Sequence, residues 1–141
     1  MVGLRLMSKT STNIKVVNSI SELGRKEWNE CAVFHSDDDS NETADPFTCY
    51  DFLHALEKSG SVGEGTGWIP YHLAAFNNNK FVGAVPLYLK SNSQGEYIFD
   101  HNWAHAFERA GGRYYPKLQI SVPFTPVTGR RLLISKNAPN N

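Results

Sequence analysis

Short stretches of alternating or continuous apolar residues predict strands along much of the chain. Residues 14–17 form a β-type run, and residues 68–76 and 81–89 read as two longer strands. Three asparagines at 77–79 separate the longer strands, and asparagine tolerates the left-handed backbone of tight turns. The pattern therefore predicts a β-hairpin, followed by a further alternating strand at 117–122.

Helical spacing predicts a first and a third helix on either side of this hairpin. The first is expected to start with Ser21 as its N-cap and to run to about residue 34, with Gly24 weakening it. A short β-prone run at 96–99 leads to the third helix, which Asp100 is expected to cap. Glycines 111 and 112 are expected to end it.

The clearest local signal marks the start of the second helix. Thr48 is the expected N-cap, and Asp51 three residues later gives an acidic variant of the capping box. Phe47 and Phe52 hold the flanking positions of a hydrophobic staple. Gly60 is expected to end this helix in a left-handed conformation.

The strand at 81–89 is apolar on both of its faces, and Pro86 interrupts its hydrogen-bonding ladder. A strand of this kind is normally covered on both sides, so helices are expected on both faces of the sheet. One face carries Phe81, Val85, Leu87 and Leu89, and the other carries Val82, Ala84 and Tyr88.

The order of these elements predicts an α+β fold with a mixed, mainly antiparallel sheet flanked by helices. We expect a flexible N-terminal segment at 1–12, a folded unit at 13–135 and a disordered tail at 136–141. Nothing after the last strand covers its far side, so the sheet is expected to be incomplete at its C-terminal end. An unpaired sheet edge predicts self-association.

Composition and charge exclude several classes of function. The 141 residues are 40% hydrophobic and 20% charged, which is typical of a globular domain. Lysine plus arginine equals aspartate plus glutamate, at 14 each, so no net charge attracts DNA or another nucleic acid. The chain has no apolar stretch long enough to span a membrane and no secretory signal, which predicts a cytoplasmic location with Cys31 and Cys49 as free thiols.

Most groups capable of chemistry lie between residues 97 and 128. His101 and His105 share one helix face with Glu108, and this spacing suits metal ligands. No further ligand cluster accompanies them, so we predict no metal site. We expect these side chains to face substrate or solvent. The same stretch holds Asp100, Trp103, Arg109, Tyr114, Tyr115, Lys117 and Gln119.

Residues 122–133 read as a strand end, a turn and the start of another helix. The free backbone N–H groups of a helix N-terminus bind phosphate or pyrophosphate, so this segment is a candidate anion site. Its four candidate residues are Thr128, Gly129, Arg130 and Arg131. The alternative is an ordinary solvated surface.

Several motifs resemble one bacterial family. The longest is residues 103–119, WAHAFERAGGRYYPKLQ, which is followed by VPFTPVTG at 122–129. Shorter matching segments lie at 45–48, 56–63, 66–73, 83–91 and 95–100. Together they resemble the FemAB-like peptidoglycan biosynthesis/recognition family of the GNAT acyltransferase superfamily.

The resemblance implies an N-acyltransferase built from two GNAT-like units, of which residues 13–135 are the first half of one. It implies an acyl-CoA or aminoacyl-tRNA donor and an amine acceptor such as a cell-wall precursor. His101, His105 or Glu108 is then the expected general base, and the polar residues from Asp100 to Gln119 are expected to bind substrate. Residues 122–133 fall where that fold places the loop for the donor pyrophosphate, with 128–131 as the expected binding residues. On this interpretation the chain by itself is inactive.

Two alternatives to a transferase stay open at this stage. The first is a recognition module that binds a glycan or peptide without catalysis, with Trp103, Tyr114 and Tyr115 as stacking surfaces. The second is a fragment with no independent activity.

Overall fold

The computed structural model describes residues 11–34 and 43–139, and within them it confirms an α+β fold. All strand pairings in this part of the chain are antiparallel. The predicted flexible segment at 1–12 falls almost wholly outside the described residues. The acidic run at 37–39 and the last two residues of the predicted tail also fall outside them.

The larger sheet has four strands in the order β1 (Thr12–Val17), β5 (His72–Asn77), β6 (Lys80–Val85) and β9 (Leu133–Ile134). The hairpin predicted at the three asparagines is confirmed. Asn78 and Asn79 have φ angles of 47° and 64°, the left-handed values that a tight turn requires.

The smaller sheet has three strands, β4 (Trp68–Pro70), β7 (Leu87–Lys90) and β8 (Lys117–Ile120). Each of the two long strands predicted from the sequence is therefore divided, one at Tyr71 and one at Pro86. Pro86 has no N–H to donate to a ladder, which is why the chain leaves one sheet there and enters the other. A separate two-stranded ribbon pairs β2 (Val33–Phe34) with β3 (Thr43–Ala44).

The first predicted helix is two helices, and Ser21 is not its N-cap. A single 3-10 turn, η1 (Ile20–Glu22), is capped by Ser19, whose side chain forms a capping box with Glu22. The chain then extends before α1 (Arg25–Ala32) begins, with Gly24 as N-cap. Gly24 therefore starts a helix instead of weakening one.

Thr48 does not cap the second helix either. This helix, α2, spans Tyr50–Lys58, and Cys49 is its N-cap residue without a side-chain cap hydrogen bond. The hydroxyl of Thr48 instead donates to the carbonyl of Asp45, at 3.2 Å. The Tyr50 N–H is accepted by Oδ1 of Asn29 on α1, at 2.8 Å. A tertiary contact thus replaces the local cap that the sequence pattern predicts.

The predicted contact between Phe47 and Phe52 is confirmed, with the rings edge to face and their centroids 5.3 Å apart. Gly60 ends α2 with φ at 74°, as expected. Deeper in, the indole N–H of Trp28 donates to the Thr48 carbonyl at 2.8 Å. Side chains from α1 therefore hold the segment before α2 in place.

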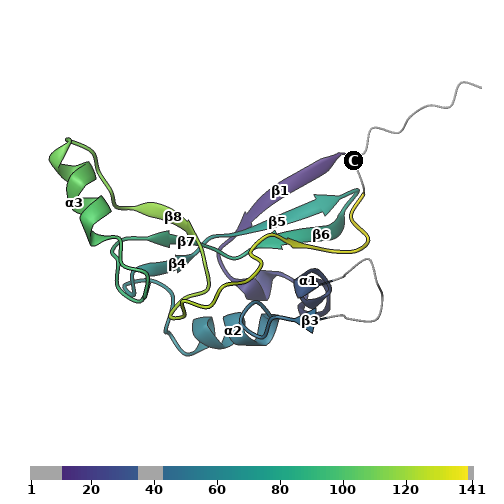
Figure 1. Cartoon of the computed structure of the whole chain (residues 1–141). Helices are drawn as coiled ribbons and strands as arrows, with labels where there is room; N and C mark the ends of the chain where they lie inside the picture. Colours follow the sequence, from purple (N-terminus) through teal and green to yellow (C-terminus); the bar gives the residue numbers. More distant parts are fainter. Residues whose placement is uncertain (1–10, 35–42, 140–141) are drawn as a thin grey trace, which may run out of the picture.

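Helices α1 and α2 lie on one side of the sheets (Figure 1) and enclose the main core, whose largest members are Ile20, Trp28, Leu53 and Leu133. In the described part of the chain no helix covers the other face, so the prediction of helices on both faces is wrong there. That face instead has a shallow apolar groove of about 200 Å³, lined among others by Ile14, Leu73, Val85 and Ile134.

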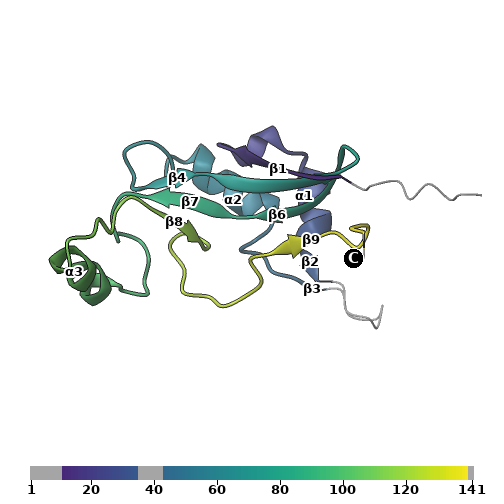
Figure 2. The same cartoon turned by 90° about the horizontal axis from the view of Figure 1, so that it is seen from above.

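The third helix, α3 (His101–Arg109), projects beyond the smaller sheet and away from α1 and α2 (Figures 1 and 2). The strand predicted at 96–99 is absent. Its backbone turns instead, with the Ile98 N–H donating to the Glu96 carbonyl and Tyr97 at a φ of 52°. None of the described helices has the length and apolar character that a membrane span requires.

The helix predicted to start near Gly129 is also absent. Residues 129–131 have no regular structure, and Leu133 and Ile134 form β9 by pairing with Ala84 and Gly83 of β6. Burial of Leu133 against α1 and β6 stabilises this strand pairing over a helix.

Candidate functional site

A cleft of about 490 Å³ lies between the 96–100 segment, strand β8 and the loop at 121–131. Its walls bring together two sets of predicted residues that are separated in the sequence. Asp100, Lys117 and Gln119 come from the predicted substrate-binding set, whereas Thr128, Gly129 and Arg131 come from the predicted donor-binding set. Arg130, the fourth predicted donor residue, does not line the cleft.

Lys117 is the central charge of the cleft. Its ammonium pairs with Oδ2 of Asp100 and with Oε2 of Glu96, the latter at 3.2 Å. Burial acts to lower the pKa of Lys117, but hydrogen bonds to Asp100 and Glu96 outweigh it and raise that pKa. The side chain therefore stays a cation on the cleft wall at neutral pH.

Asp100 is the N-cap residue of α3, as predicted, but its side chain acts as a hub of hydrogen bonds in the cleft. No side-chain cap bond joins it to α3. Its carboxylate accepts hydrogen bonds from Lys117 and from the hydroxyls of Tyr114, at 2.7 Å, and Tyr115, at 3.5 Å. Burial acts to raise the pKa of Asp100, but the bonds from Lys117 and Tyr114 lower it overall, so the group is ionised at neutral pH.

Two charged residues at the base of the cleft were missed by the sequence analysis. Glu96 lines the cleft with its side chain only 4% exposed. Lys90, whose side chain is fully buried, lies 3.8 Å from Glu96 and places its ammonium 3.5 Å from the centre of the Trp68 ring. Burial is the main cause that lowers the pKa of Lys90 to about 8. The sequence did hold a signal. Side chains alternate along a strand, so Lys90 shares a face with the buried Tyr88, whereas Leu89 lies on the other face.

The loop at 121–131 is fastened at both ends of the cleft. At one end the Phe124 ring packs on Trp68, with centroids 5.8 Å apart, and the Phe124 N–H donates to the Gly95 carbonyl. At the other end Arg131 donates to the Val127 carbonyl at 2.6 Å and pairs with Asp45 at 3.7 Å. The predicted donor segment is thus an extended wall and offers no helix N-terminus to a phosphate.

The three predicted catalytic residues lie outside the cleft, on the exposed surface of α3. His105 and Glu108, with Asn102 and Arg109, line a separate shallow depression. His101 stacks on Phe99, with ring centroids 5.5 Å apart. Trp103, which was predicted to bind substrate, is 73% exposed on the same helix. Their proposed roles stay predictions, and the structure does not bring them together with Lys117.

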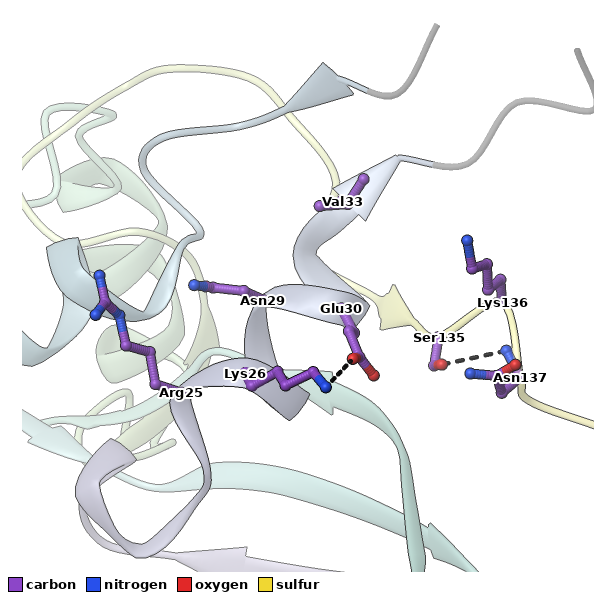
Figure 3. A pocket seen from close by; sticks show the side chains of 8 residues that line it. All are labelled: Arg25, Lys26, Asn29, Glu30, Val33, Ser135, Lys136 and Asn137. Carbon is purple, nitrogen blue, oxygen red and sulfur yellow. Dashed lines mark hydrogen bonds and ion pairs between the residues drawn. The ribbon is translucent and has the colours of Figure 1, made fainter. Parts of the chain in front are cut away.

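Another pocket, of about 680 Å³, lies between α1 and residues 135–137 (Figure 3). Figure 3 shows it lined by four side chains of α1, by Val33 and by residues 135–137, with Lys26 paired to Glu30 at 3.9 Å. Its lysine and arginine side chains are exposed, and none of the predicted site residues reaches it. Across the described residues, no group of three or more His, Cys, Asp or Glu side chains is placed to hold a metal ion.

Comparison with known protein families gives a match. A model of the FemAB-like family, described as peptidoglycan biosynthesis/recognition, matches residues 19–141. No curated protein and no solved structure matches the chain.

Proposed function

Because the chain belongs to the FemAB-like family of peptidoglycan biosynthesis and recognition, we propose that its cleft binds the reactants of an N-acyl transfer. In this reaction an acyl or aminoacyl group passes to the amine of a cell-wall precursor. The observation that supports this proposal is the meeting of predicted substrate-side and donor-side residues in one cleft. We propose a GNAT-like fold for the unit and acyl-CoA or aminoacyl-tRNA as donor.

The charges of the cleft suit such a reaction. The amine nitrogen forms a bond to the donor carbonyl carbon, and the amine proton passes to a base. The thioester or ester bond breaks, and the coenzyme A sulfur or the tRNA hydroxyl oxygen leaves and takes up a proton. Lys117 and Gln119 offer N–H donors that stabilise negative charge on the carbonyl oxygen as the amine attacks. Holding both reactants in one cleft supplies the positioning on which this kind of catalysis depends.

Two sets of groups are candidates for the base. Asp100 and Glu96 lie in the cleft, whereas His101, His105 and Glu108 act only if the acceptor amine reaches the surface of α3. Single-turnover transfer by an active, longer relative distinguishes them. Loss of transfer on replacing the residue equivalent to Asp100 by Asn supports the cleft. Loss only on replacing the three α3 residues supports the helix surface.

Binding of the donor is the first test for this chain. We expect coenzyme A and acetyl-coenzyme A to raise its melting temperature in a concentration-dependent way. Gln119→Ala is expected to reduce that rise, whereas Lys80→Met, which changes an exposed lysine on the far hairpin, is the matched control. An unchanged rise in Gln119→Ala places the donor elsewhere, and no rise with either ligand argues against an acyl-CoA donor.

A recognition module is the second candidate function, and the exposed aromatic side chains near α3 favour it. Phe99 and Trp103 are 72% and 73% exposed, which gives flat surfaces on which a sugar ring can stack. Saturable binding of muropeptide fragments that is lost in Trp103→Ala supports this function. Binding that survives in Trp103→Ala but is lost in Lys117→Met supports the cleft.

A further inference from the structure

A buried ion pair, Lys90 with Glu96, lies directly beneath the cleft. Three neighbours fix the position of Lys90. Its ammonium donates to the Gln94 carbonyl at 2.9 Å, lies over the ring of Trp68, and faces Oε1 of Glu96 at 3.8 Å. The Trp68 indole N–H donates to the same Gln94 carbonyl at 2.9 Å, so β4, β7 and the turn at 94–96 meet at this point.

Glu96 stands between two cations. Its Oε2 pairs with Lys117 at 3.2 Å, on the cleft side, and its Oε1 faces Lys90, on the buried side. In the described part of the chain Oε1 has no hydrogen-bond partner. Its attraction to the Lys90 ammonium is therefore the main interaction that this oxygen makes.

Lys117 depends in turn on Glu96. Its two charge partners are Glu96 and Asp100, and Asp100 is also engaged by Tyr114 and Tyr115. The charged groups that face Lys90 are thus Glu96 at contact distance and Asp100 and Lys117 beyond it. They form one chain of alternating charge from the buried base to the cleft wall.

We propose that Lys90 is a positioning residue, which holds Glu96 against Lys117 and so fixes the Lys117 ammonium on the wall of the cleft. The inference rests on the proposed function only in taking the cleft as the ligand site. It gives a role to two residues for which neither the motif pattern nor the family match supplies one.

The role of Lys90 is separable from simple charge repulsion, because the two make opposite predictions for Lys117. The comparison needs a pH at which both lysines are charged. If Lys90 acts only as a nearby positive charge, its removal strengthens the pairing of Lys117 with Glu96 and Asp100, and the Lys117 ammonium hydrogens exchange with water more slowly. If Lys90 positions Glu96, its removal leaves a buried carboxylate with one oxygen unpaired, and Glu96 moves away from Lys117. The Lys117 ammonium hydrogens then exchange faster.

The test is the rate at which the Lys117 ammonium hydrogens exchange with water, measured by NMR at pH 6 on the full chain labelled with ¹⁵N at the lysine side-chain nitrogens. At this pH both lysines are charged. Signals are assigned by the variants Lys90→Met and Lys117→Met. We expect the Lys117 exchange rate to rise several-fold in Lys90→Met and by a similar factor in Glu96→Gln. Lys80→Met is the matched control and leaves it unchanged. Lys90→Gln, which keeps a donor for the Gln94 carbonyl, replaces Lys90→Met if the latter does not fold.

The double variant Lys90→Met/Glu96→Gln completes the cycle. Because Lys90 acts through Glu96, we expect the double variant to match Glu96→Gln alone. A Lys117 exchange rate that falls or stays the same in Lys90→Met overturns the proposal, and so do additive effects in the double variant. These readouts need no ligand, so they hold or fail independently of the acyl-transfer function.

Discussion

Nε2 of His72 lies 3.2 Å from Oε1 of Glu57, and Nδ1 of the same ring accepts the N–H of Leu87 at 3.3 Å. His72 is fully buried on β5, Glu57 is on α2, and Leu87 begins β7. Since Nδ1 is an acceptor, Nε2 carries the proton and donates to Glu57. One imidazole therefore links a helix to both sheets close to the points where the chain crosses between them.

Glu57 also accepts the backbone N–H of Ile20 and the hydroxyl of Ser19, at 3.0 and 2.7 Å, and so holds η1 as well. We expect Glu57→Gln to lower the free energy of unfolding by about 2 kcal/mol, because charge-assisted bonds are replaced by weaker neutral ones. Urea denaturation at pH 7 measures this. Glu64→Gln, at an exposed loop position, is the control and is expected to change little.

The same pair predicts a dependence on acid. Burial acts to raise the pKa of Glu57, but the bonds from His72, Ser19 and Ile20 lower it overall. A carboxylate with a lowered pKa stabilises the fold above its unfolded pKa, and that stability is lost as pH falls through the folded value. Wild type is thus expected to lose stability below about pH 4, and Glu57→Gln is expected to lose less. Parallel acid curves contradict this prediction.

Lys90 predicts a second dependence, in the alkaline range and with the same sign as that of Glu57. Its pKa is about 8 in the fold and 10.5 in the unfolded chain, so between these values the unfolded state binds more protons. Stability from this group therefore rises with pH, by up to about 3 kcal/mol over the whole window. We expect the free energy of unfolding of wild type, minus that of Lys90→Met, to increase from pH 8 to pH 10.

The difference between the two proteins is the quantity to measure, because Cys31 opposes the trend in both. Burial raises the pKa of the Cys31 thiol to about 11, so its contribution to stability falls as pH rises above 9. That contribution cancels in the subtraction. A difference that is flat with pH would mean that Lys90 is not buried as a titrating ammonium.

The contact that replaces the predicted Thr48 cap is testable on its own. Asn29→Ala leaves the Tyr50 N–H without its acceptor and is expected to cost about 1 kcal/mol, the usual value of a lost helix cap. Asn29→Asp keeps an acceptor oxygen and is the matched control, with an expected loss close to zero. Equal losses in the two variants would show that the Asn29 amide acts in some other way.

The packing of Phe124 and Trp68 around Gly95 predicts that a side chain at this position strongly destabilises the fold. This residue has a φ of 75°, and a Cβ there would lie 2.6 Å from the Phe124 ring and 2.9 Å from the Trp68 indole nitrogen. We expect Gly95→Ala to cost more than 2 kcal/mol, the sum of backbone strain and displaced ring packing. Gly65 has a similar φ of 79° with nothing within 4 Å, so Gly65→Ala reports the strain alone, at about 1 kcal/mol. Equal losses would show that Phe124 does not pack as described.

Local chemistry explains which parts of the fold the sequence predicts. Asn78 and Gly60 adopt left-handed backbone readily and Pro86 cannot donate to a ladder, so the hairpin, the helix end and the interrupted ladder are predicted correctly. The division of each long strand between two sheets is not predicted. The start of α2 depends on Asn29, twenty-one positions away from Tyr50, and no local pattern reveals such a partner. The helix predicted to start near Gly129 is wrong for the same reason. The strand found there, at 133–134, forms only through its pairing with β6.

The candidate site was also predicted only in part from the sequence. The polar residues of 100–119 and the loop at 128–131 were predicted from motif and resemblance. The structure brings three of the seven predicted substrate residues and three of the four predicted donor residues into one cleft. The α3 residues His105 and Glu108 were selected by helical spacing, which shows that they share a face but not that the face points away from the cleft. Glu96 was missed because it lies in a segment predicted to be a strand.

The most direct test of the central claim is to map where a cell-wall precursor binds. The measurement is the change in backbone ¹⁵N–¹H NMR signals of the full chain on titration with a muropeptide that carries a free amine. We predict saturable changes at Lys117, Gln119, Thr128 and Gly129, with the α1 pocket of Figure 3 unaffected. Changes confined to α3, or to the pocket beside α1, would contradict the assignment of the cleft as the functional site.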